Sequence, residues 1–262
     1  MMADIFDSHA HYDDPAFDPD RDELLASLPG AGVCGLITCG TDIPTSRFNL
    51  ELAHRYDYIW AAAGFHPEAA GRITDADFDT LRLLLADEKC VAVGELGLDY
   101  HYEDGAPRPV QLAVLERQLA LANELELPVI FHDRDAHADT LALLRQYRPQ
   151  GVVHCFSGSV EMARELVNIG MYIGLGGAVT FKNARKPVEV AQYLPEDRLL
   201  IETDCPYMTP VPFRGKRNAS DLIPHTAHRL AEIRGCTPEQ ILAQTRANAE
   251  RLFLHKKLEI QF

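Results

Sequence analysis

One pattern repeats along this chain: a short apolar run, a polar residue at its end, and then an amphipathic stretch. The apolar runs lie at residues 5–6, 33–39, 58–65, 91–96, 128–132, 152–156, 171–176 and 199–203. Apolar strands that alternate with helices are typical of a parallel sheet that is covered on both faces. This repetition limits the possible folds more strongly than any other feature of the sequence.

The amphipathic stretches predict a helix after almost every apolar run. They lie at 20–27, 46–56, 75–87, 109–124, 136–146, 160–169 and 187–193, and two further helices are expected at about 224–234 and 238–254. Eight such units, with no Gly-rich phosphate loop, favour a barrel over an open doubly wound sheet. We therefore expect an α/β protein: a single (β/α)₈ TIM barrel over residues 1–262, with additional C-terminal helices.

The composition indicates a cytoplasmic protein. Apolar residues make up 47% and charged residues 24% of the 262 residues, and no apolar run is long enough to cross a bilayer. The N-terminus has no signal-peptide pattern, and the six scattered cysteines form no C-x-x-C pair, which favours reduced thiols. We expect no membrane association, and nothing implies a stable protein partner.

The net charge of −14 argues against broad, non-specific adhesion to nucleic acid, which normally uses a basic surface. It does not exclude an anionic substrate, because bound metal ions can reverse the sign of the charge within a site.

Polar residues at the ends of the expected strands predict a site. In a TIM barrel the chemistry takes place at the C-terminal ends of the strands. His9 and His11 stand two positions apart, so both side chains leave the same face of a strand. The ends of later apolar runs carry His66, Glu95, His132, His154 and Asp204. Taken singly, each has an ordinary alternative, such as a core histidine, an ion-paired carboxylate or a turn cap. A barrel would bring them to one rim.

Six of these side chains form the expected ligand set for divalent metal. Four imidazoles and two carboxylates exceed the needs of one tetrahedral ion, which predicts two ions. A bridging carboxylate suits ions about 3.5–4 Å apart. Glu95 is the expected bridge, because its strand faces the other strands concerned on both sides. One ion would take His9, His11, Glu95 and Asp204, and the other Glu95, His132 and His154.

At these residues the chain resembles the TatD family of metal-dependent deoxyribonucleases, within the amidohydrolase-like hydrolases. The matching segments run almost from end to end: FDSHAHYD (6–13), GFHPE (64–68), GELGLDYHY (94–102), PVIFHDRDA (128–136), VVHCFSG (152–158), ETDCPYMTPVPFRGKRN (202–218) and NAERLF (248–253). Ala219-Ser220 departs from the family, in which an acidic residue and proline are common here. The resemblance implies a TIM barrel, a divalent-metal phosphodiesterase, DNA as substrate, and the same six ligands.

The expected mechanism is hydrolysis of a phosphodiester by water that the metal centre activates. Asp204 is the expected proton acceptor, as well as a ligand. His66 either binds a phosphate oxygen, protonates the leaving group, or only fixes the loop before Pro67. Asp99 and Tyr100 are expected to support the site. The loop at 212–218 is the densest basic cluster, and its expected substrate-binding residues, together with Tyr100, are Phe213, Arg214 and Lys216.

Two other functions remain open from the sequence. The first is ester or amide hydrolysis by the same centre, as in a deacylase of charged transfer RNA. Many amidohydrolases carry a carboxylated lysine where this chain has Glu95, which disfavours that subgroup. The second is a non-catalytic, metal-stabilised nucleic-acid-binding module, which the net acidity disfavours. The ligands do not choose among Zn, Mg and Mn.

Overall fold

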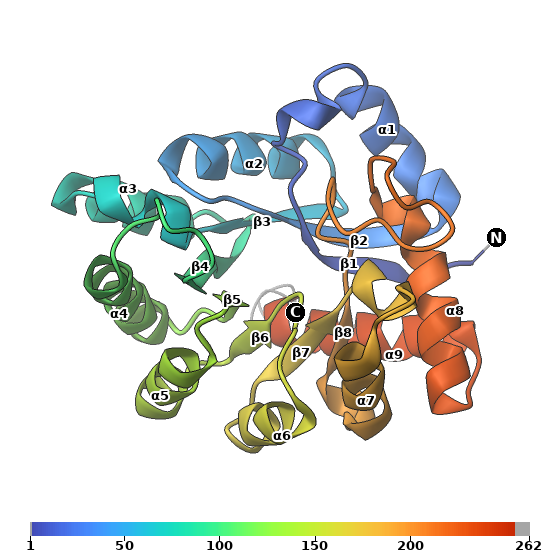
Figure 1. Cartoon of the computed structure of the whole chain (residues 1–262). Helices are drawn as coiled ribbons and strands as arrows, with labels where there is room; N and C mark the ends of the chain where they lie inside the picture. The colour runs from blue at the N-terminus through green and yellow to red at the C-terminus, as the bar shows by residue number, and fades with distance from the viewer. Residues whose placement is uncertain (1, 255–262) are drawn as a thin grey trace.

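The computed structural model describes residues 2–254, which form a barrel of parallel strands surrounded by helices (Figure 1). Each strand pairs in parallel with the next, in chain order. The strands are β1 (Ile5–Ala10), β2 (Val33–Cys39), β3 (Ile59–Ala63), β4 (Cys90–Asp99), β5 (Val129–Arg134), β6 (Gly151–Val153), β7 (Tyr172–Leu175) and β8 (Leu199–Ile201). The predicted TIM barrel is confirmed.

The helices follow the strands as the amphipathic stretches predict. They are α1 (Arg21–Ser27), α2 (Ile43–Arg55), α3 (Asp75–Leu85), α4 (Arg108–Leu125), α5 (His137–Tyr147), α6 (Val160–Asn168), α7 (Arg185–Tyr193), α8 (Ile223–Arg234) and α9 (Pro238–Ala249). Short 3₁₀ helices lie at Pro15–Phe17, Leu28–Ala31, Pro67–Arg72, Gly177–Thr180, Glu196–Arg198 and Ser220–Leu222, and a π-helix at Glu250–Leu254 ends the described chain. No helix within residues 2–254 is both long and apolar enough to span a membrane.

Local capping explains where several helices begin. The carboxylate of Asp42 accepts a hydrogen bond from Thr45 N, and the Thr45 side chain is bonded in return to the backbone of Asp42. This capping box starts α2 three residues before the predicted start at 46. Thr74 and Thr237 cap α3 and α9 in the same way.

Two apolar layers hold the barrel together. The larger one packs strand residues against the surrounding helices. The smaller one takes side chains from all eight strands together with Leu252, Phe253 and Leu254, and none from α1 to α8. It therefore fills the barrel interior, and the π-helix after α9 covers it at the end opposite the site.

The strands β8 and β1 meet without a regular ladder. They are joined by an isolated bridge between Ala10 and Cys205, by Asp204 N donating to His9 O (3.0 Å), and by Ser8 Oγ donating to Ile201 O (3.0 Å). We call this junction the seam. It is the one position in the described barrel where neighbouring strands depend on side chains and loop residues for closure.

Candidate metal centre

A cavity of about 510 Å³ opens at the C-terminal ends of the strands. The side chains of His11, His66, Glu95, His132, His154 and Asp204 all line it. His9 lies directly behind them and is fully buried. The structure thus brings together all seven residues that the strand ends predict for the site.

Glu95 occupies the middle of this group and is almost completely buried. Its Oε2 atom lies 3.4 Å from His9 Nε2 and 3.1 Å from His11 Nε2. Its Oε1 atom lies 2.8 Å from His154 Nε2 and 3.1 Å from His132 Nδ1. Each carboxylate oxygen therefore faces its own pair of imidazoles, an arrangement suited to a carboxylate that bridges two ions.

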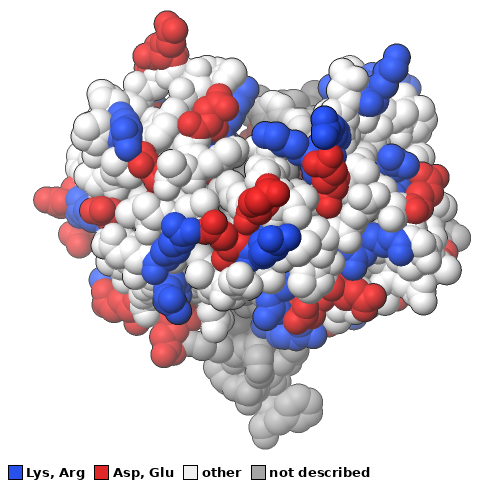
Figure 2. Space-filling model, turned by 60° about the horizontal axis from the view of Figure 1, so that its bottom comes forward, with Lys and Arg blue, Asp and Glu red and all other residues white. Residues whose placement is uncertain are grey.

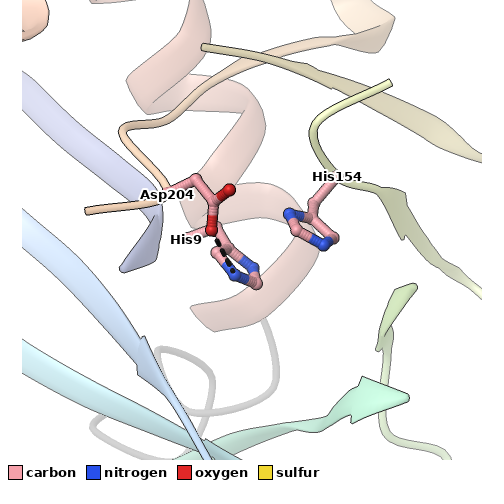
Figure 3. Close-up of side chains that lie close together, drawn as sticks. All are labelled: His9, His154 and Asp204. Carbon is pink, nitrogen blue, oxygen red and sulfur yellow. Dashed lines mark ion pairs between the residues drawn. The ribbon is translucent and has the colours of Figure 1, made fainter. Parts of the chain in front are cut away.

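Asp204 lies beside the first pair of imidazoles, those of His9 and His11. Its Oδ1 atom lies 3.6 Å from the Nε2 atoms of both His9 and His11. The ring of His154 stacks on that of His9 at 3.8 Å between centroids, so potential ligand atoms of His9, His154 and Asp204 lie within 4.8 Å of one another (Figure 3). His154 consequently borders both halves of the ligand set, and the division between the two predicted ions is less sharp than the sequence implies.

Most of the imidazoles have one nitrogen held by the protein and the other turned toward Glu95. His11 Nδ1 donates to Cys39 O (3.0 Å), and His132 Nε2 is bonded to Asp99 Oδ2 (3.1 Å). Such contacts fix the tautomer and leave a lone pair on the free nitrogen for a metal ion. Asp99 therefore supports a predicted ligand, His132, without being one of the six.

The charges of the cluster are coupled through Glu95. Burial raises the pKa of the Glu95 carboxyl, but His154, His9 and His66 more than offset this and hold the pKa well below its usual range. Burial lowers the pKa of His11, yet its bonds to Glu95 and the nearby Asp204 raise it to about 10. Protons on the imidazoles thus stabilise the carboxylate where metal cations would otherwise do so.

The donor set fits divalent metal on the evidence of its own geometry. The Nε2 atoms of His9 and His11 are 3.0 Å apart and face the same carboxylate oxygen, which brings three ligand atoms to one point. His154 Nδ1, on the far side of its ring, has no hydrogen-bond partner among the described residues. Imidazole nitrogens and carboxylate oxygens in this arrangement are ligands for zinc and similar divalent ions.

His66 is held as a hydrogen-bond donor. Its Nδ1 atom accepts from Glu68 N (3.3 Å), which places the proton of the neutral ring on Nε2, 3.7 Å from Glu95 Oε1. Burial lowers the pKa of His66 to about 3, so the neutral form prevails at pH 7. A protonated Nε2 offers no lone pair to a metal, although His66, Glu95 and His132 lie close enough to form a ligand group.

Two buried carboxylates were not among the predicted site residues. Glu202 accepts from Cys155 N (2.5 Å), lies 3.8 Å from His154 Nδ1, and has its pKa raised to about 8 by burial. Asp7 accepts from the backbone and hydroxyl of Thr203 (2.9 and 2.6 Å) and from Ser220 Oγ (2.6 Å). In the sequence, each stands two positions before a predicted ligand, Glu202 before Asp204 and Asp7 before His9, and Glu202 also lies at the end of an apolar run.

The predicted substrate-binding residues do not line the cavity. Tyr100 OH donates to Asp139, and the guanidinium of Arg214 lies 3.8 Å from the ring centroid of Phe181. Phe213 packs edge-on against His225, and Lys216 lies over the Phe213 ring. The part of these four residues in substrate binding remains a prediction.

Comparison with known proteins places this chain in a family. The profile of a family described as "TatD related DNase" matches residues 6–254. The "uncharacterized metal-dependent hydrolase YabD" of Bacillus subtilis is 44% identical over 252 residues, which cover 95% of this chain and 98% of that protein.

Two further proteins are similar to this chain over almost its whole length. The "3'-5' ssDNA/RNA exonuclease TatD" of Cronobacter sakazakii is 39% identical over 260 residues, covering 95% of this chain and 98% of its own. The crystal structure of YJJV, a TatD homologue from Escherichia coli, superposes with a TM-score of 0.90 at 34% identity, covering 97% of this chain and 99% of that one. The chain therefore belongs to the TatD family of DNases and is a metal-dependent hydrolase.

Proposed function

We propose that this protein hydrolyses phosphodiester bonds of DNA at a centre of two divalent ions. The observation that carries the proposal is the Glu95 carboxylate, whose oxygens each face a separate pair of imidazoles. The relative from Cronobacter sakazakii, named as an exonuclease of single-stranded DNA and RNA, supports a polynucleotide substrate.

The ligand assignment follows the two faces of Glu95. His9, His11 and Asp204 would hold one ion on the Oε2 side, and His132 and His154 would hold the other on the Oε1 side. Divalent ions in such a pair lower the pKa of a bound water and stabilise the charge that develops on the phosphoryl oxygens. The nitrogen-rich ligand set suits Zn, whereas phosphoryl chemistry often uses Mg or Mn.

The protein's own groups would handle protons and orientation. Burial raises the pKa of the Asp204 carboxyl, which makes it a better acceptor for the proton of the attacking water. His66 presents a neutral Nε2–H, which suits a hydrogen bond to a phosphate oxygen better than delivery of a proton to the leaving group, given its pKa of about 3.

The test compares substrates and metals on one preparation. Chelated protein is reloaded with Mg, Mn or Zn and assayed on single-stranded DNA, duplex DNA, RNA and an aminoacyl ester. We expect metal-dependent cleavage of DNA that Glu95→Gln abolishes, while Glu51→Gln, an exposed position on α2, leaves it intact. Cleavage of the ester alone would establish the deacylase alternative, and binding without turnover would establish the binding module.

A cytoplasmic location is part of the proposal. None of the six cysteines forms a disulfide within the described residues, as expected in a reducing compartment.

A further inference from the structure

Two aromatic side chains are exposed at the mouth of the catalytic cavity. Within residues 2–254, the exposed large apolar side chains are Leu83, Tyr102, Val110, Tyr207 and Val211. Only Tyr102 and Tyr207 line this cavity, with 47% and 57% of their surface accessible. Exposed aromatic rings beside a catalytic centre indicate contact with a ligand.

Tyr207 is anchored to a proposed metal ligand. Its backbone N donates to Asp204 O (2.9 Å), and its hydroxyl donates to Asp14 Oδ2 (2.8 Å). The ring is therefore held at both ends while its surface stays open to solvent. Such a fixed ring can stack on a planar group at little cost in side-chain entropy.

Tyr102 and Arg134 form a second anchored unit. Arg134 Nη1 donates to Tyr102 OH (3.0 Å), and its guanidinium carbon lies 5.1 Å from the centroid of that ring. Arg134 follows His132 by two positions on β5, so both side chains leave the same face of the strand. The Arg134 guanidinium is thereby directed to the side on which His132 serves the metal centre.

The charge around the cavity makes Arg134 distinctive. Among the described residues that line the cavity, Arg134 is the one lysine or arginine, and the lining carboxylates are Asp13, Asp14, Glu68, Glu95, Asp99 and Asp204. Outside the proposed metal centre, Arg134 is therefore the described lining side chain whose charge attracts the phosphates of an anionic chain. Arginine matches the geometry of a phosphate with a bidentate fork.

A second pocket continues the cavity past Tyr102. It has a volume of about 280 Å³ and shares Glu68, Asp99 and Tyr102 with the catalytic cavity. Tyr102 therefore stands between the two spaces. A strand that extends from the metal centre in this direction passes the tyrosine ring.

From these contacts we propose that Tyr102 and Tyr207 stack on nucleobases either side of the phosphate at the metal centre, and that Arg134 binds a neighbouring phosphate. This inference rests on the proposed nuclease function and assigns the side chains that would hold an unpaired strand, the kind of substrate that the name of the relative from Cronobacter sakazakii includes. Stacking on protein rings requires bases that are splayed out of a helix, which a single strand supplies readily and a duplex does not. Because every base has a flat face, these contacts tolerate any sequence.

The first experiment measures steady-state cleavage of a short single-stranded oligodeoxynucleotide by the metal-loaded protein. Tyr102→Leu and Tyr207→Leu are each expected to raise KM about tenfold or more, with a smaller change in kcat. Tyr207→Phe keeps the ring and is expected to stay within about threefold of the unmodified protein. Tyr56→Leu, at the end of α2 away from the cavity, is the matched control.

An abasic substrate probes the same contact without changing the protein. Removing the base next to the scissile phosphate is expected to raise KM for the unmodified protein, and this penalty is expected to vanish in the leucine variant that lost the matching ring. If the abasic substrate raised KM equally in the unmodified protein and in the leucine variant, the stacking assignment would be overturned. An unchanged KM for the intact oligonucleotide in both leucine variants would overturn it as well.

Arg134 is tested in the same assay. Arg134→Ala is expected to raise KM about tenfold, Arg134→Lys to recover part of the loss, and Arg229→Ala on α8 to have no effect. Normal KM values in the Arg134 and tyrosine variants, with cleavage still lost in Glu95→Gln, would refute this inference and leave the proposed function standing. Absence of DNA cleavage in the unmodified protein would refute both.

Discussion

Five imidazoles lie around the two oxygens of Glu95, and each is expected to contribute differently to the two proposed ions. His9 lies on the Oε2 side and also stacks on His154. His9→Ala is expected to weaken the ion shared with Asp204 more than the ion held by His132 and His154, because it removes one direct ligand from the first. Titration of the chelated protein with metal, followed by calorimetry, resolves the two sites.

His132→Ala should instead weaken the second ion, on the Oε1 side, more than the first. His228→Ala, at an exposed position on α8, should change the affinity of neither site. Equal loss of both ions in His9→Ala would contradict the division of ligands.

Proton release provides a test of the charge state of the same cluster. The pKa values of His11 and His132 are raised to about 10 because their bonds to Glu95, and to Asp99 for His132, outweigh burial. Both rings therefore carry a proton at pH 7 without metal, and a metal ion must displace it. We expect binding to release about one proton from each ring, and metal affinity to rise as pH rises from 6 to 8.

Calorimetry in buffers of different ionisation enthalpy measures the release, and His11→Ala should release about one proton fewer. A heat of binding that does not depend on the buffer would contradict the prediction. The stability of the metal-free fold depends on pH in the opposite sense to metal affinity. Because the folded pKa lies above the unfolded value, these protons stabilise the metal-free fold below pH 6.5, and this contribution is lost as pH rises through about 10.

The sequence predicted which residues meet at the site better than it predicted their protonation and their hydrogen-bond partners. Strand-end position alone brought His9, Glu95 and Asp204 together, because parallel strands in a barrel end at one rim. The tautomer of His66 depends on the backbone of Glu68, and the anchoring of Tyr102 depends on Arg134 of another strand. The first contact is local, a side-chain cap at the start of the 3₁₀ helix Pro67–Arg72, but the sequence left it open beside other roles for His66. The second is tertiary, and no local pattern encodes it.

The bounds of the strands were also predicted less well than their existence. The predicted run at 91–96 stops too early, because Gly97, Leu98 and Asp99 continue to pair with β5 although their composition is mixed. The runs at 152–156 and 199–203 extend too far, since β6 and β8 end at Val153 and Ile201. Apolar character indicates burial, and buried residues continue past the last ladder bond.

One glycine in β4 allows the close approach of two strands that carry predicted ligands. Gly97 has φ +149°, and a Cβ atom there would lie 1.9 Å from His132 O. Gly97→Ala is expected to force β4 and β5 apart, lowering the free energy of unfolding by about 2–4 kcal/mol and weakening metal binding. Urea denaturation and metal titration measure the two effects.

Gly30→Ala is the control, because a Cβ atom at Gly30 meets nothing within 4 Å. Its free energy of unfolding should change by less than about 1 kcal/mol. If Gly97→Ala behaved in the same way, the close approach of the two strands would be refuted.

The buried carboxylate of Asp7 stabilises the seam through hydrogen bonds. It is fully buried and accepts hydrogen bonds from Thr203 and Ser220, next to the loop that carries Asp204. Asp7→Ala leaves those donors without their acceptor and should lower the free energy of unfolding by about 2–5 kcal/mol. Asp79→Ala, exposed on α3, should have little effect, and an equally small loss for Asp7→Ala would refute this role.

At the scale of the whole molecule, charge predicts a weak dependence of DNA binding on salt. Lys and Arg are interspersed with Asp and Glu on the face drawn in Figure 2, and Arg134 is the one such cation among the described residues lining the cavity. Each phosphate neutralised on a single strand contributes about −0.7 to the slope of log affinity against log salt. We expect a slope near −1, measured as log(1/KM) between 50 and 200 mM salt. A slope steeper than about −3 would indicate a basic surface outside the cavity, such as the loop at 212–218.

The seam also sets an order of events during synthesis. Ser8 and Ile201 are 193 positions apart, and Asp7 and Thr203 are 196 apart. Strand β1 leaves the ribosome before β8, yet the edge of β1 that faces β8 stays unpaired until β8 has been made. His9 and His11 therefore cannot meet Asp204 until the chain has been translated past position 204. An incomplete chain therefore lacks this group of predicted ligands, and hydrolysis that depends on them has to await closure of the barrel.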